Sequence, residues 1–199
     1  DKMFPMKFKA ILTCLLLSSG LAFSQTIGTL KPEAQKLYSA NFNMDFDAVV
    51  VLSYPQMIAD YGKEKFIEKL DADYLNEEYR MRIQLETPPI MTFSAIQKME
   101  GKSFCVASFR NPKRFFFENK LNAETAAQKA AMLKEYNQTQ DVTFEPKRNS
   151  FNVRRITKFI AVADETTDNT WKFFNADDPI QRQAFETIFG SELKKQLGL

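Results

Sequence analysis

The spacing of apolar residues changes near residue 80, and this change restricts the chain to folds that combine helices with a sheet. Between Lys63 and Tyr79 the apolar residues recur every three or four positions, which is the period of an amphipathic helix. From Arg80 to Glu86 apolar and polar residues alternate, as in a half-buried strand. Helices followed by antiparallel strands predict an α+β domain.

The same division extends over the predicted single domain, residues 25–199. We expect helices over about 31–79, a sheet over about 80–175 and a C-terminal helical tail over 178–199. An alanine-rich segment at 123–136 predicts a helix inserted between strands. A strongly curved antiparallel sheet around the leading helices would enclose an apolar pocket.

Residues 1–24 have the three-part pattern of a secretory signal peptide. A basic start and an apolar run over residues 10–17 precede Ala22-Phe23-Ser24, with cleavage expected before Gln25. An uncleaved anchor and a lipoprotein acylated at Cys14 are the alternatives, but the apolar run is short for a permanent anchor. The sequence therefore predicts an exported protein, periplasmic or secreted, with no stable membrane anchor after cleavage.

The charged residues exclude several classes of function. The chain has no histidine, which excludes histidine-based triads, histidine general bases and most zinc or iron sites. The full chain has 27 Lys and Arg against 25 Asp and Glu, and residues 25–199 carry 24 of each. A neutral domain has no bulk attraction for nucleic acid. We expect no nucleic-acid partner, no metal site and no cofactor.

Cys105 is the one cysteine of the predicted mature domain, so no internal disulfide can hold that domain together. A nucleophile or a redox thiol is one interpretation. The strand-like run Phe104-Cys105-Val106-Ala107 favours a cysteine that packs in the core.

Two parts of the chain resemble a known family. Residues 44–55 (MDFDAVVVLSYP) and 61–62 (YG) precede a charged amphipathic helix, and residues 160–163 (IAVA) and 170–174 (TWKFF) form a closing hairpin. Together they are similar to small exported bacterial proteins of unknown function in the nuclear transport factor 2-like superfamily. The resemblance implies the cystatin-like cone fold and a possible homodimer through the outer sheet face. The chain departs from the family in two places. Gly62 stands alone where the family often has two glycines, and the acidic turn of the hairpin, residues 164–169, lacks the glycine common there.

Asp45 and Asp47 are the candidate catalytic carboxylates. One of them could act as a base in the pocket, with Tyr54 or Tyr61 as an oxyanion donor. The alternative is that both aspartates cap and charge the first turn of a helix. That alternative is favoured.

Aromatic residues supply the candidate ligand-binding site. An apolar cavity with few polar groups binds ligands without any further motif. Ordinary core packing is the alternative, and it is favoured by a narrow margin. The candidates are Tyr38, Tyr54, Tyr61, Phe104, Phe115, Phe117, Trp171 and Phe173.

Two short basic segments could form an anion-binding patch. They are Lys113-Arg114 and Arg154-Arg155 with Lys158. Alternation along a strand would place Arg154 and Lys158 on one face and Arg155 on the other. The zero net charge of the domain favours a solvated surface instead.

These observations favour an exported, non-enzymatic domain that binds a small apolar ligand or a protein partner in or around a cone-shaped pocket. One alternative is a pocket enzyme of isomerase, cyclase or dehydratase type that uses an aspartate base and a tyrosine. The other is a structural envelope or secretion accessory protein.

Overall fold

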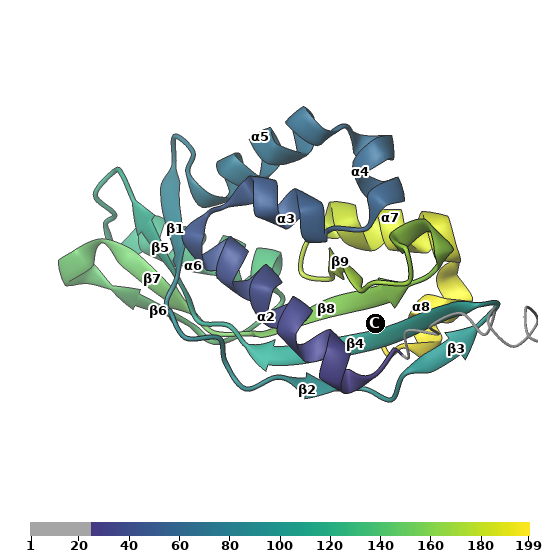
Figure 1. Ribbon diagram of the computed structural model, residues 1–199. Helices are drawn as coiled ribbons and strands as arrows, with labels where there is room; N and C mark the ends of the chain where they lie inside the picture. The colour runs from purple at the N-terminus through teal and green to yellow at the C-terminus, as the bar shows by residue number, and fades with distance from the viewer. Residues whose placement is uncertain (1–24) are drawn as a thin grey trace, which may run out of the picture.

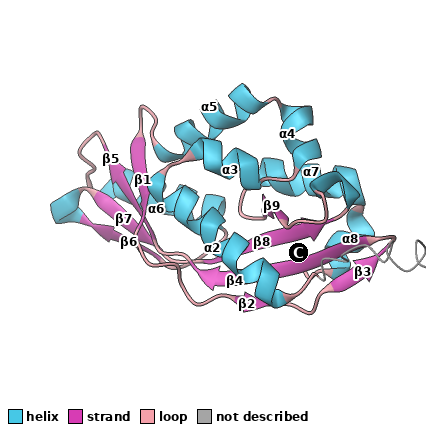
Figure 2. Ribbon diagram, viewed as in Figure 1, coloured by secondary structure: helices cyan, strands magenta, loops and turns pink. Residues whose placement is uncertain are grey.

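The structure is a computed structural model that describes residues 25–199 (Figure 1). The predicted signal peptide, residues 1–24, lies outside the described residues. Within residues 25–199 the fold is α+β, with seven α-helices and two antiparallel sheets (Figure 2). This confirms the expected α+β class, but the strands form two sheets where one was expected over about 80–175. No helix in this range is long and apolar enough to cross a membrane.

Four helices come first and lie along one side of the sheets (Figure 1). They are α2 (Ile27–Asn43), α3 (Phe46–Leu52), α4 (Pro55–Tyr61) and α5 (Lys63–Tyr74).

The first helix begins earlier than the sequence predicted. The Thr26 side chain accepts a 3.2 Å hydrogen bond from the backbone N–H of Thr29, and this cap starts the helix at Ile27 rather than near residue 31. Gly62 separates α4 from α5 with a φ of 91°, a conformation that strains residues with a side chain. The chain therefore turns between these two helices within one residue.

The strands form two antiparallel sheets. In the first, the order is β1 (Tyr79–Ile83), β5 (Lys113–Phe117), β7 (Ser150–Val153) and β6 (Val142–Glu145). In the second, the order is β2 (Thr92–Phe93), β4 (Lys102–Arg110), β8 (Ile156–Ala163) and β9 (Lys172–Asn175), and β3 (Gln97–Met99) also pairs with β4.

Two long segments run through both sheets with one continuous register. Arg110 of β4 faces Ile156 of β8, and Lys113 of β5 faces Val153 of β7. The two-residue links between these strands therefore fall opposite each other. Pro112, in one link, has no N–H to donate, so the hydrogen-bond ladder is interrupted there. We call this junction of the two sheets the sheet bend.

The remaining elements complete the domain. The alanine-rich segment forms α6 (Ala123–Asn137), as expected, and Asn122 caps it by accepting a 2.8 Å hydrogen bond from the backbone N–H of Thr125. Two 3₁₀ turns follow, at Pro146–Arg148 and Glu165–Thr167. The tail contains α7 (Pro179–Phe189) and α8 (Ser191–Gln196).

The hydrophobic core is rich in aromatic side chains. Its largest fully buried members come from helices α2, α4, α5, α6 and α7 and from both sheets. They are Tyr38, Phe66, Phe104, Phe115, Phe151, Phe173, Phe174, Phe185, Leu30, Met57, Leu133 and Ile160. Helices and sheets therefore share a single core.

Candidate functional site

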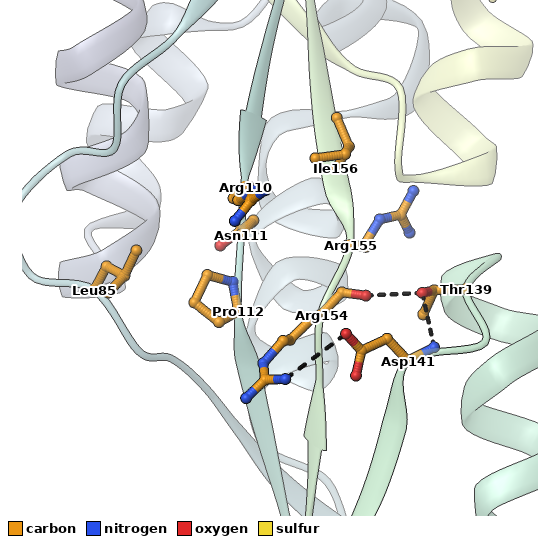
Figure 3. A pocket seen from close by; sticks show the side chains of 9 residues that line it. All are labelled: Leu85, Arg110, Asn111, Pro112, Thr139, Asp141, Arg154, Arg155 and Ile156. Carbon is orange, nitrogen blue, oxygen red and sulfur yellow. Dashed lines mark hydrogen bonds and ion pairs between the residues drawn. The ribbon is translucent and has the colours of Figure 1, made fainter.

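The sheet bend carries a surface pocket of about 650 Å³, which we call the bend pocket (Figure 3). Its walls come from the two links of the bend, the segment after β1 and the loop before β6. The lining residues are Leu85, Arg110, Asn111, Pro112, Thr139, Asp141, Arg154, Arg155 and Ile156.

Hydrogen bonds hold the loop before β6 against the bend. The Thr139 hydroxyl donates to the carbonyl oxygen of Arg154 at 2.8 Å, and the N–H of Asp141 donates to the Thr139 hydroxyl at 3.2 Å (Figure 3). The N–H of Arg154 donates to the carbonyl oxygen of Asp141 at 3.0 Å. This wall of the pocket is therefore built into the fold.

The bend pocket combines positive charge with exposed apolar surface. Arg154 lies 3.8 Å from Asp141, and Arg110 is exposed with no ion pair to any described residue. Leu85 and Ile156 expose 41% and 52% of their surface, respectively. Water screens such an exposed and distant ion pair, so Asp141 neutralises Arg154 only weakly.

Neighbouring arginines at the bend point in opposite directions. Figure 3 shows Arg154 and Arg155 turned away from one another, as expected for successive residues of an extended chain. The Arg155 guanidinium donates to Oδ1 of Asp177 at 2.8 Å, and about nine-tenths of each side chain is buried. Arg155 is therefore a buried residue, whereas the sequence favoured a solvated one.

A chain of hydrogen bonds completes this buried pair. The Thr157 hydroxyl donates to Oδ2 of Asp177 at 2.6 Å and accepts from the amide Nδ2 of Asn111 at 3.0 Å. Both oxygens of Asp177 are therefore occupied. The Oδ1 of Asn111 and the Nε of Arg155 are buried and have no hydrogen-bond partner among the described residues.

A second, smaller space of about 60 Å³ lies between the sheet bend and helices α5, α6 and α7, and we call it the polar cavity. Arg155 lines both the bend pocket and the polar cavity. The residues that line the polar cavity are Asn41, Leu70, Asp73, Tyr74, Met81, Lys113, Phe115, Tyr136, Asn137, Arg155, Asn175, Asp177, Asp178 and Gln181.

Lys69 links two carboxylates at one side of the polar cavity. It forms ion pairs with Asp178 and, at 2.7 Å, with Asp73. Burial opposes the charge on Lys69, yet the two carboxylates outweigh burial and raise its pKa. Burial also raises the pKa of Asp73, although the charge and the hydrogen bond of Lys69 act to lower it.

Lys113 has no such partner. It lies two residues before Phe115 on β5, so its side chain shares the inward face of the strand with a fully buried ring. The Lys113 ammonium group forms no hydrogen bond or ion pair with any described residue. Burial lowers the pKa of its ammonium group, and the more distant Asp177 carboxylate offsets this only in part.

The candidate catalytic carboxylates lie elsewhere. Asp45 caps α3 by accepting a 3.0 Å hydrogen bond from the N–H of Ala48, and the exposed Asp47 lies 3.1 Å from Lys63. Neither aspartate lines the bend pocket or the polar cavity. Asp45 at the cap and Asp47 in the first turn of α3 agree with the helix-capping interpretation.

Tyr54 has a buried carboxylate partner that the sequence did not indicate. Its hydroxyl donates to Oδ2 of Asp164 at 2.7 Å and accepts from the Thr166 hydroxyl at 3.1 Å. Burial raises the pKa of Tyr54 to about 12, with a smaller contribution from Asp164. Neither Tyr54 nor Asp164 lines the two spaces at the bend.

Seven of the eight candidate aromatic residues are buried in the core, and Tyr61 is partly buried. Phe115 lines the polar cavity, and Tyr61 lines a separate groove beside α4 and α7. Their role in ligand binding stays a prediction. Asp73, Asp177 and Asp178 lie near helix starts and ends, and nothing in the sequence around them indicates that they meet at one cavity.

Comparison of the chain with protein-family models, with curated proteins and with solved structures finds no match.

Proposed function

We propose that this chain is a non-enzymatic binding protein that takes a small, mainly apolar ligand with an anionic group in the bend pocket. The observation that carries this proposal is the meeting of two exposed arginines with exposed Leu85 and Ile156 around one pocket of about 650 Å³. Arg110 has no ion pair with a described residue, and Arg154 has only an exposed pair with Asp141 at 3.8 Å. Pockets for small organic ligands have volumes of roughly 300–1,000 Å³.

The chemistry of the pocket defines the ligand class. Leu85, Pro112 and Ile156 offer an apolar wall, and the guanidinium groups of Arg110 and Arg154 offer paired donors for a carboxylate or a sulfonate. Asp141, at the rim, disfavours a ligand with more than one negative charge. A single-headed organic acid with an apolar body satisfies all of these groups.

The rival enzymatic function has less support. It requires a carboxylate that faces a cavity within reach of a tyrosine hydroxyl, and Asp45 and Asp47 are instead exposed at the start of α3. The Tyr54–Asp164 pair has suitable chemistry but lines neither the bend pocket nor the polar cavity.

We further propose that the fold is a variant of the cystatin-like cone and that the protein is exported. The helices on one side of the sheets and the unbroken register across the bend support the cone. The pattern of residues 1–24 supports export. A homodimer through the sheet face remains a proposal by resemblance alone.

The test is a fluorescence titration with 8-anilinonaphthalene-1-sulfonate, an apolar ring system that carries one sulfonate. We expect saturable binding by the wild type. The double variant Arg110→Gln, Arg154→Gln should weaken it about tenfold, because two exposed charge contacts contribute about 0.2–1 kcal/mol each before desolvation by the ligand. Ile156→Ser should weaken it several-fold through lost apolar contact.

Two substitutions distant from the pocket serve as matched controls. Arg148→Gln removes an exposed arginine from the turn after β6, and Ile180→Ser removes an exposed isoleucine from α7. Both should bind the dye as the wild type does. Equal weakening in the pocket and control variants, or no saturable binding at all, would overturn the proposal.

A further inference from the structure

The outer face of the first sheet concentrates positive charge. Alternate residues of a strand point to opposite faces, and the buried rings of β5 and β7 mark the face that meets the core. The strand residues on the other face are Arg80, Arg82, Arg114, Phe116, Thr143, Glu145, Ser150 and Asn152. This set has three arginines and one carboxylate, whereas residues 25–199 carry equal numbers of basic and acidic residues. We call Arg80, Arg82, Arg114 and Phe116 the arginine face.

Phe116 holds two of these arginines in place. The guanidinium carbon of Arg80 lies 5.1 Å from the centroid of the Phe116 ring, and that of Arg114 lies 5.9 Å from it. A cation over an aromatic ring is attracted to it without using its N–H donors. Arg114 is fixed further by a 2.8 Å hydrogen bond to Asn152 and a 3.2 Å ion pair with Glu145. A partner would therefore meet side chains that are already partly ordered, which lowers the entropic cost of binding.

The other two cations of the face, Arg80 and Arg82, have no ion pair with a described residue. Arg80 is exposed. Nη1 of Arg82 donates to the carbonyl oxygen of Met81 at 2.7 Å, and the five N–H donors of a guanidinium leave others for a partner. Partial burial and the charge of Arg80 lower the pKa of Arg82, so the two arginines repel one another. A carboxylate placed between them would relieve that repulsion.

The geometry of the face suits an extended chain. Arg80 and Arg82 are two residues apart on β1, and an extended peptide presents its own alternate side chains at the same spacing of about 7 Å. A hollow of about 230 Å³ beside Arg114, lined also by Asn152 and Arg154, has room for a further side chain. Carboxylates at alternate positions of one peptide can therefore reach all three arginines.

Acidic residues around the arginine face disfavour broader anions. Glu118 follows Phe116 at the end of β5, Glu145 lies on β6 and Asp141 lies just before β6, and all three are at least partly exposed. A membrane surface or a nucleic acid would bring phosphates over these carboxylates, whereas a narrow chain can lie along the arginines. Two copies of the protein that met through this face would place arginine against arginine, which opposes association.

We propose that the arginine face is a docking surface for an extended acidic segment of a partner protein, with carboxylates at alternate positions. The fork of N–H groups on each guanidinium matches a carboxylate, and arginine is enriched at protein interfaces. No residue of the arginine face lines the bend pocket, so this docking surface is separate from the function proposed above.

Fluorescence anisotropy with a labelled peptide of alternating glutamate and threonine tests the surface. We expect saturable binding that weakens as sodium chloride is added, and no binding of the peptide with glutamine in place of glutamate. The double variant Arg80→Gln, Arg82→Gln should weaken binding about tenfold. Arg80→Gln alone should weaken it about threefold, and this variant leaves the hydrogen bond of Arg82 to Met81 intact.

Lys63→Gln, Lys65→Gln is the matched control. It removes the same two charges from exposed positions two residues apart on α5, and it should bind the peptide as the wild type does. The arginine double variant should still bind 8-anilinonaphthalene-1-sulfonate as the wild type does, so this proposal and the proposed function can fail separately.

Three results would overturn the proposal. The first is equal weakening of peptide binding in the arginine and lysine variants, or no saturable binding by the wild type. The second is stronger binding to phosphatidylglycerol vesicles than to the peptide, which would indicate a lipid surface. The third is a dimer in sedimentation velocity that the arginine double variant dissociates, which would indicate a second copy of the chain.

Discussion

The hydroxyl of Tyr38, on α2, donates a 2.6 Å hydrogen bond to the carbonyl oxygen of Leu85. Leu85 forms one wall of the bend pocket, so this bond ties that wall to the first helix, 47 residues away in the chain. A core tyrosine therefore positions a residue of the proposed site without touching the pocket itself.

Tyr38→Phe should loosen the segment around Leu85, because it removes the hydrogen bond to the Leu85 carbonyl oxygen. Loss of one hydrogen bond of this kind costs about 1 kcal/mol, and we expect that decrease in the free energy of unfolding in urea. The affinity for 8-anilinonaphthalene-1-sulfonate should fall a few-fold, because Leu85 is no longer fixed. Tyr61→Phe is the control, since the Tyr61 hydroxyl makes no hydrogen bond with a described residue. An unchanged affinity in Tyr38→Phe would show that the bond does not shape the pocket.

Alkaline pH should destabilise the protein through two buried tyrosines. Burial raises the pKa values of both Tyr38 and Tyr54 to about 12, from 10.0. Because the folded pKa values exceed the unfolded ones, this stabilisation is fully present below pH 10 and is lost as the pH rises through about 12. The free energy of unfolding should therefore decline over that window, and the decline should be smaller in Tyr54→Phe. A flat profile would contradict the burial of these phenols.

The buried Arg155–Asp177 pair should be sensitive to the loss of one partner. Asp177→Asn leaves the Arg155 guanidinium buried without its counter-charge, and we expect a cost of about 3–5 kcal/mol in urea unfolding. Asp47→Asn breaks the exposed contact with Lys63 and should cost less than about 1 kcal/mol. Similar costs at the two sites would mean that Arg155 is solvated.

Phe173 distinguishes core packing from an apolar ligand site. Its side chain is fully buried and contacts Phe159 with the ring centroids 6.2 Å apart. If it is packed core, Phe173→Ala should cost about 3–5 kcal/mol in the free energy of unfolding. Val51→Ala, at an exposed position of α3, should stay within about 0.5 kcal/mol of the wild type. A small cost at Phe173 would indicate free space beside the ring.

Cys105 should be unreactive in the folded protein. It is fully buried, its thiol contacts Ser94, and burial raises the pKa of the thiol, so little thiolate forms. Alkylation by iodoacetamide, quantified on the peptide that contains Cys105, should be slow in buffer and fast in urea. Rapid alkylation without urea would support the redox interpretation instead.

The sequence predicted the order of the elements because each has a local signal. The change of apolar period near residue 80 located the boundary between helices and sheet, and the alanine-rich segment formed α6 within one residue of the expected end. α2 begins at Ile27, about four residues before the expected start near residue 31, because the Thr26 side chain caps the helix there.

The sites at the bend could be predicted only in part. Alternation correctly separated Arg154 from Arg155, and the inward position of Lys113, two residues before Phe115, was available from the sequence. Asp177 and Asp178 join these residues only through the tertiary fold, across more than 20 residues of chain. Asp178 before Pro179 indicates a helix start, which the structure confirms, but this pattern does not indicate an ion pair. A neutral net charge suggested a solvated surface, but it says nothing about where opposite charges are buried together.

The most direct test of the proposed function locates a bound ligand on the protein. Backbone amide signals are assigned for residues 25–199 and followed by NMR during titration with decanoate, which has an apolar chain and one carboxylate. We expect saturable shifts that cluster at Arg110, Thr139, Asp141 and Ile156 around the bend pocket. Shifts centred on Trp171 and Phe173 in the core, or no saturable shifts, would contradict it.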